Sequence, residues 1–134
     1  MTTQENNPPK TKSQLYQEEF DYIFGKKAFC VRGALVTAAL IEGQIWLLAK
    51  SFPAKKGVIH KPESRQEYFQ SLDVLKTNKI LNSQELKQMK IFRTERNNSI
   101  HGIFKGMTRR QWEEQNNKVV NLGRPIITNL DEKL

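Results

Sequence analysis

One apolar stretch, VRGALVTAALIEGQIWLLA at residues 31–49, limits the possible folds of this chain more than any other segment. Its apolar residues recur at helical spacing but cover more than one face, which is typical of a helix surrounded by other elements. A membrane span of this length would have to be nearly free of charge, and the stretch carries Arg32, Glu42 and Gln44. We therefore expect a helix from about Lys26 to Lys50 at the centre of a helical bundle, and no membrane association.

Four further segments show apolar residues at helical spacing, and their ranges are 13–24, 62–76, 82–102 and 108–122. Ser13, Asn82 and Thr108 are suited to begin helices, because their side chains can accept hydrogen bonds from free backbone N–H groups. Gly123 and Pro125 should end the last helix. No run alternates at period two, so the sequence predicts an all-α, up-and-down bundle of four to five helices. The last ten residues receive no assignment.

The first dozen residues, MTTQENNPPKTK, differ in character from the rest of the chain. They are polar, contain two adjacent prolines and have no apolar periodicity, so they cannot contribute a packed face. At 134 residues the chain suits one core. We expect residues 1–12 to form a disordered arm and residues 13–134 to form a single domain.

Cysteine content and the N-terminal sequence bear on the cellular compartment. Cys30 is the only cysteine, so no internal disulfide can form, which fits a reducing environment. No apolar leader segment follows the first methionine. These features predict a cytoplasmic protein. Because Cys30 stands in an apolar run, we expect it to be a small buried hydrophobic residue.

The positive charge of the chain is concentrated in one region. Residues 87–110 contain seven basic residues and one acidic residue, a net +6 of the total +8. Clustered basic residues favour a polyanionic partner, most plausibly nucleic acid, although a solvated basic face without a ligand is the alternative. The candidate contacts to nucleic acid are Lys90, Arg93, Lys105, Arg109 and Arg110.

The heptad RNNSIHG, residues 96–102, lies at the end of the fourth predicted helix. On a helix, Arg96 and His101 lie about 140° apart around the axis and about 7.5 Å apart along it, whereas Asn97 and His101 share a face. Asn97 can therefore orient the imidazole while the long Arg96 side chain reaches toward it. One helix supplies only one arginine and one histidine to such a site. Two copies facing each other across a twofold axis would make a cleft.

The chemistry that suits such a cleft is cleavage of an RNA phosphodiester. The ribose 2′-hydroxyl attacks the adjacent phosphorus, and an arginine stabilises the charge that builds on the phosphoryl oxygens. A histidine that titrates near neutral pH can take the hydroxyl proton or protonate the leaving oxygen. The catalytic candidates are therefore Arg96, His101 and Asn97.

We expect no metal site and no cofactor, because one cysteine and two histidines cannot supply a Cys/His ligand set. The second histidine, His60, stands in a Gly/Pro-rich loop and is interpreted as a surface residue. A purely structural role for the heptad is also open: Arg96 would pair with a carboxylate such as Glu42, and His101 would cap the helix end.

The heptad also resembles the signature of a known family, the HEPN domains (higher eukaryotes and prokaryotes nucleotide-binding). That signature is an arginine, usually followed by a polar residue such as asparagine, and then a histidine after four to six intervening positions. The resemblance extends to the long helix with Glu42 inside it and to the helix, connector and helix of residues 71–102. It therefore covers most of the chain after the arm.

The resemblance implies a bundle that forms a homodimer and places two motifs in a shared cleft. Active members are metal-independent endoribonucleases, many of them toxins of toxin–antitoxin or phage-defence systems, and an antitoxin protein is then a further partner. One toxin branch has a tyrosine two places after the histidine, where this chain has Ile103, so membership of that branch is not expected. Other members are inactive, so a non-catalytic helical dimer that binds nucleic acid or a protein is the alternative function.

Overall fold

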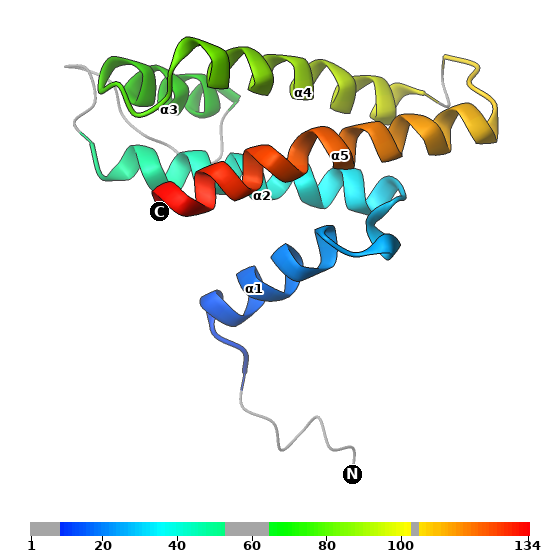
Figure 1. Cartoon of the computed structure of the whole chain (residues 1–134), viewed down its shortest axis with the longest axis horizontal. Helices are drawn as coiled ribbons and strands as arrows, with labels where there is room; N and C mark the ends of the chain where they lie inside the picture. Colours follow the sequence, from blue (N-terminus) through cyan, green and yellow to red (C-terminus); the bar gives the residue numbers. More distant parts are fainter. Residues whose placement is uncertain (1–8, 53–64, 103–104) are drawn as a thin grey trace.

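The computed structural model describes residues 9–52, 65–102 and 105–134, and every regular element within these ranges is helical. The all-α helical bundle predicted from the sequence is therefore confirmed. Figure 1 shows the long helices α2, α4 and α5 running side by side, with α1 and α3 packed beside α2. The elements are α1 (Lys12–Ile23), the short 3-10 helix η2 (Lys26–Ala28), α2 (Val31–Lys50), α3 (Arg65–Thr77), α4 (Ser83–His101) and α5 (Arg109–Lys133).

Helix α2 is the centre of the bundle, as the apolar stretch predicted. It contacts α1, α3, α4 and α5, and its buried side chains include Ile41, Ile45 and Leu48. These side chains share a core with Leu75 of α3 and with apolar residues of α5 such as Ile127. By length and composition alone, α2 is the one described helix that could cross a membrane, a property that core helices of soluble proteins share.

The predicted start of the central helix at Lys26 is wrong, because α2 begins at Val31 after a separate 3-10 turn. Cys30 is the N-cap residue, and its side chain accepts a hydrogen bond from the Gly33 backbone N–H. A Cβ atom added to Gly33 would lie only 1.6 Å from the backbone oxygen of Ala28. Gly33 therefore lets the 3-10 turn fold back against the first turn of α2.

Replacing Gly33 by alanine should lower the free energy of unfolding by about 2–3 kcal/mol, because a rigid backbone atom blocks the new methyl group. Gly43→Ala in the same helix is the matched control, since a Cβ there meets nothing within 4 Å. That variant should gain about 0.5–1 kcal/mol from the higher helix propensity of alanine. Urea unfolding of both variants measures the difference. Equal effects of the two substitutions would contradict the packing described for Gly33.

The predicted end of the last helix at Gly123 and Pro125 is also wrong, because α5 continues through both residues to Lys133. A Cβ on Gly123 would lie 2.0 Å from Cγ2 of Thr37, so this glycine marks a close approach of α5 to α2 and not a helix end.

Arg124, which lies between Gly123 and Pro125 in α5, donates to the backbone oxygens of Ile23 and Gly25, at 2.8 and 3.0 Å. Arg124 thereby satisfies carbonyl groups at the end of α1.

The remaining helix starts are set by capping side chains. α1 begins at Lys12 and Thr11 is its N-cap residue, so the predicted cap at Ser13 is wrong. The Thr11 side chain accepts a hydrogen bond from the Gln14 N–H, and Ser13 lies within the first turn. Asn82 and Glu85 form the predicted capping box of α4, and Thr108 with Gln111 forms that of α5. Residues 1–8 of the predicted arm and residues 62–64 of the predicted third helix lie outside the described residues.

Candidate functional site

The heptad occupies the last turn and a half of α4 and is fixed against the start of α5. The indole Nε1 of Trp112 donates to the backbone oxygen of Ser99 at 2.6 Å. Gly102 follows the helix, and a Cβ there would lie 2.6 Å from Trp112 and 2.8 Å from the Met107 sulfur. The sequence around Trp112 thus holds the end of α4, and with it the backbone of His101, in a defined place.

Arg96 is anchored to the central helix. Its guanidinium donates to Glu42 Oε1 at 3.1 Å, and its side chain is 21% exposed, whereas that of Glu42 is 47% exposed. The pairing with Glu42 that the structural interpretation predicted is confirmed. A guanidinium carries five N–H donors, so a single contact of this kind leaves other donors that can bind a further acceptor.

Asn97 and His101 lie on the exposed side of the same helix end. Both residues are exposed, and the described part of the chain contains no hydrogen bond or ion pair made by either side chain. The predicted contact between the Asn97 amide and the imidazole is not formed. Nor does the structure join Arg96 to His101: the first side chain points to α2, and the second faces solvent within one chain.

The five predicted nucleic-acid contacts are divided between two places. Lys90 and Arg93 border a groove between α3 and α4, where the Arg93 guanidinium lies 4.8 Å from the ring centres of Tyr68 and Phe69. The remaining three lie near the start of α5, where the Lys105 ammonium donates to Asn98 at 3.3 Å. The basic window therefore does not form one uninterrupted row of free cations.

Two ion pairs reduce the charge at the start of α5. Arg109 pairs with Glu113 at 3.1 Å and Arg110 with Glu114 at 3.3 Å, and both arginines are about nine-tenths exposed (92% and 89%). These carboxylates lie just beyond residue 110, so a count over residues 87–110 leaves them out. Exposed pairs at this spacing are weak, so a phosphate can compete for either arginine.

Glu95, the one acidic residue within residues 87–110, connects α4 to α5. Gln115 donates to its side-chain oxygen at 2.8 Å and to its backbone oxygen at 3.0 Å, and the Lys118 ammonium lies 3.3 Å away. The hydrogen bond from Gln115 lowers the pKa of the Glu95 carboxyl, and Lys118 lowers it further, against the opposing effect of burial. The contact between Glu95 and Gln115 joins two helices, so no local sequence motif predicts it.

This network should make stability depend on pH in the acid range. Because the pKa of Glu95 is lower in the folded chain, its contribution is complete above the unfolded pKa, near 4.5, and is lost as pH falls through the folded pKa. Glu95→Gln removes that titration. We expect the free energy of unfolding of the parent to exceed that of this variant at pH 7. The difference between the two free energies should shrink steadily below about pH 4.5. A difference that stays constant from pH 7 to pH 3, measured by urea unfolding, would contradict the prediction.

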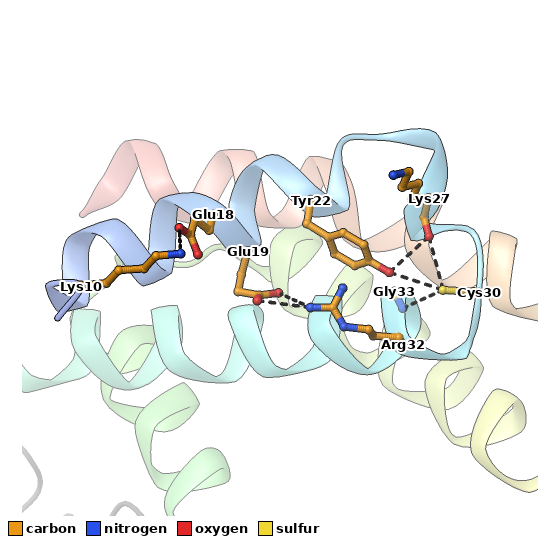
Figure 2. A network of polar contacts seen from close by, with 8 residues as sticks. All are labelled: Lys10, Glu18, Glu19, Tyr22, Lys27, Cys30, Arg32 and Gly33. Atoms are coloured by element: carbon orange, nitrogen blue, oxygen red, sulfur yellow. Dashed lines mark hydrogen bonds and ion pairs between the residues drawn. The ribbon is translucent and has the colours of Figure 1, made fainter. Parts of the chain in front are cut away.

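Cys30 is not the buried hydrophobic residue predicted from the sequence. It is partly exposed at the start of α2, and Figure 2 shows its sulfur beside the Tyr22 hydroxyl, the Lys27 carbonyl and the Gly33 N–H, each 3.4 Å away. Burial opposes ionisation of the thiol, but hydrogen bonds from Tyr22 and from backbone N–H groups outweigh it and lower the pKa of Cys30. A lowered pKa at a helix N-terminus favours reactivity of the thiolate.

No group of three or more His, Cys, Asp or Glu side chains suited to a metal ion occurs among the described residues. His60 lies outside those residues, so its predicted surface position is not described. Comparison of the chain with protein-family models, with curated protein sequences and with solved structures gave no match.

Proposed function

We propose that this chain is a metal-independent endoribonuclease that acts as a homodimer through Arg96 and His101, with Asn97 in support. The observation that carries the proposal is the pairing of Arg96 with Glu42, one and a half turns before an exposed histidine. An arginine held in this way keeps its orientation, and the N–H donors that Glu42 does not engage can still bind a phosphoryl oxygen. The exposed imidazole is free to exchange protons with a substrate.

The proposed reaction is an internal transesterification. The 2′-oxygen of the ribose forms a bond to the adjacent phosphorus as its proton passes to the imidazole of one His101. The bond from phosphorus to the 5′-oxygen breaks, and that oxygen takes a proton from the second imidazole, which gives a 2′,3′-cyclic phosphate and a 5′-hydroxyl end. Arg96 stabilises the negative charge on the two free phosphoryl oxygens.

A second copy of the chain supports this reaction in a way that one chain does not. Within one chain Arg96 faces α2 and His101 faces solvent, so a single helix offers one proton-transfer group at a time. A twofold partner brings a second arginine and a second histidine to the same phosphate. We propose further that the nuclease is a toxin of a toxin–antitoxin or phage-defence system in the cytoplasm, with an antitoxin protein as partner.

The test is cleavage of bulk RNA by the purified protein in excess EDTA, measured over a range of protein concentrations. Because the cleft needs two copies, activity per chain should rise with concentration and level off once dimers dominate, in parallel with the mass measured by light scattering. Cleavage that requires added Mg²⁺, or activity per chain that is independent of concentration while the protein is monomeric, would contradict the proposal.

A non-catalytic binding protein is the second candidate, and the separation of Arg96 from His101 within one chain favours it. A guanidinium engaged with Glu42 and an imidazole without a partner side chain among the described residues are also what a scaffold would show. This candidate predicts binding of RNA or DNA that weakens steeply as salt is raised, through residues such as Lys90 and Arg93, and no turnover at any enzyme concentration.

A further inference from the structure

A cavity lies between the first turns of α2 and α5. Both helices begin at the same end of the bundle (Figure 1), and a pocket of about 620 Å³ opens between them. Its apolar wall is formed by Phe29, Val31, Met107 and Trp112. A volume of this size suits a small organic molecule, and two aromatic side chains favour a flat ring.

Two helix N-termini and one arginine bring positive charge to the pocket. Cys30 and Thr108, the N-cap residues of α2 and α5, both line it, so the N-terminal ends of a 20-residue helix and a 25-residue helix meet there. Free backbone N–H groups and the helix dipoles favour an anion at such ends. Arg109 lines the same pocket and adds a full positive charge, which Glu113 partly offsets.

Two side-chain oxygens next to the pocket have no hydrogen-bond partner among the described residues. Asn116 is only 2% exposed, and its side-chain oxygen lies beneath the pocket surface with no partner in the described part of the chain. The same holds for the side-chain oxygen of Asn117, another residue of the pocket lining. A buried acceptor without a donor costs free energy, so a ligand that supplies an N–H group would gain from meeting one.

From these three features we infer that the pocket binds a small aromatic anion that carries an N–H donor. The ring lies between Phe29, Met107 and Trp112, and the anionic group lies at the two helix ends with Arg109. The N–H group is positioned to bind the side-chain oxygen of Asn116 or Asn117 when that side chain turns toward the ligand. This inference does not depend on the proposed nuclease activity, because none of the pocket residues belongs to the pair Arg96 and His101. Binding and cleavage can therefore fail separately.

The chain provides a matched control for the anion contact. Arg109–Glu113 and Arg110–Glu114 are ion pairs of the same type one residue apart, but only the first pair lines the pocket. Arg109→Gln should weaken binding of an aromatic anion, and Glu113→Gln should strengthen it by freeing the guanidinium. The equivalent changes at Arg110 and Glu114 should have no effect.

The probe is 8-anilinonaphthalene-1-sulfonate, an aromatic anion with one N–H group, compared with N-phenyl-1-naphthylamine, which lacks the sulfonate. By fluorescence titration of the folded protein, we expect the sulfonate to bind at least about tenfold more tightly than its neutral analogue. Arg109→Gln should raise its Kd about three- to tenfold, and Asn116→Leu should raise it about two- to tenfold. Equal Kd values for both probes, or equal effects at Arg109 and Arg110, would overturn the inference.

Cys30 supplies a second readout that does not depend on any substitution of a buried residue. As the only cysteine it can be alkylated with iodoacetamide and followed by mass spectrometry. Because Cys30 lines the pocket, saturating sulfonate probe should slow alkylation of the parent at least about fivefold, and the neutral analogue at the same concentration should slow it less. An unchanged alkylation rate with bound probe would place the probe elsewhere and overturn the inference.

Discussion

Substitution of His101 by alanine should lower the rate of RNA cleavage by about 10²–10⁴-fold, the range typical for loss of a group that transfers a proton in the transition state. The same substitution should leave the free energy of unfolding within about 0.5 kcal/mol of the parent value, because the His101 side chain is exposed. The matched control is His60→Ala, which removes the other histidine of the chain and should cleave RNA at the parent rate.

These variants separate catalysis from folding and from contamination. A nuclease carried over from the expression host would be equally active in preparations of the parent, His101→Ala and His60→Ala. Cleavage rates that are equal in all three, or that fall only in proportion to a loss of folded protein, would remove His101 from the mechanism.

Substitution of Arg96 by alanine should lower the cleavage rate by about 10²–10³-fold, as expected when a donor to the developing phosphoryl charge is removed. Arg96→Lys should recover only part of that loss, because an ammonium group cannot form the planar fork of a guanidinium. Stability should change by at most about 1 kcal/mol in either variant, since the pair with Glu42 is partly exposed to solvent.

Glu42→Gln tests whether the ion pair positions the arginine. It retains the guanidinium but removes the carboxylate that holds it at 3.1 Å. We expect a smaller loss of cleavage than in Arg96→Ala, with the same dimer mass and unchanged unfolding. If Arg96 serves only to connect α4 with α2, Glu42→Gln and Arg96→Ala should instead have equal effects on stability and none on cleavage.

The helical elements of this fold were predictable because their signals are local. Apolar spacing and capping residues such as Asn82 and Thr108 act within a few positions, and the structure places helices in each predicted region that it describes. The errors at Lys26 and Gly123 have a different origin. Both errors arise from contacts between segments, which local spacing does not reveal. The turn at Lys26 folds back against Gly33, and Gly123 permits a close approach between α5 and α2. The packing of α5 in the bundle keeps Pro125 inside the helix.

The candidate site was predictable only in part. The pairing of Arg96 with Glu42 followed from the placement of an acidic residue on the central helix, but the contact of Gln115 with Glu95 and that of Trp112 with Ser99 join residues distant in sequence. The polar position of Cys30 was missed because the 3-10 turn before α2 exposes a residue that a continuous helix would have buried.

In the proposed mechanism, Arg96 and His101 direct a 2′-hydroxyl to attack phosphorus without a metal ion. The most direct measurement is the chemical end left on the upstream fragment when an RNA oligonucleotide is cleaved in excess EDTA, determined by mass spectrometry. We expect a 2′,3′-cyclic phosphate from the parent protein and no fragment from His101→Ala. A 3′-hydroxyl end, or cleavage that appears only when Mg²⁺ is restored, would contradict it.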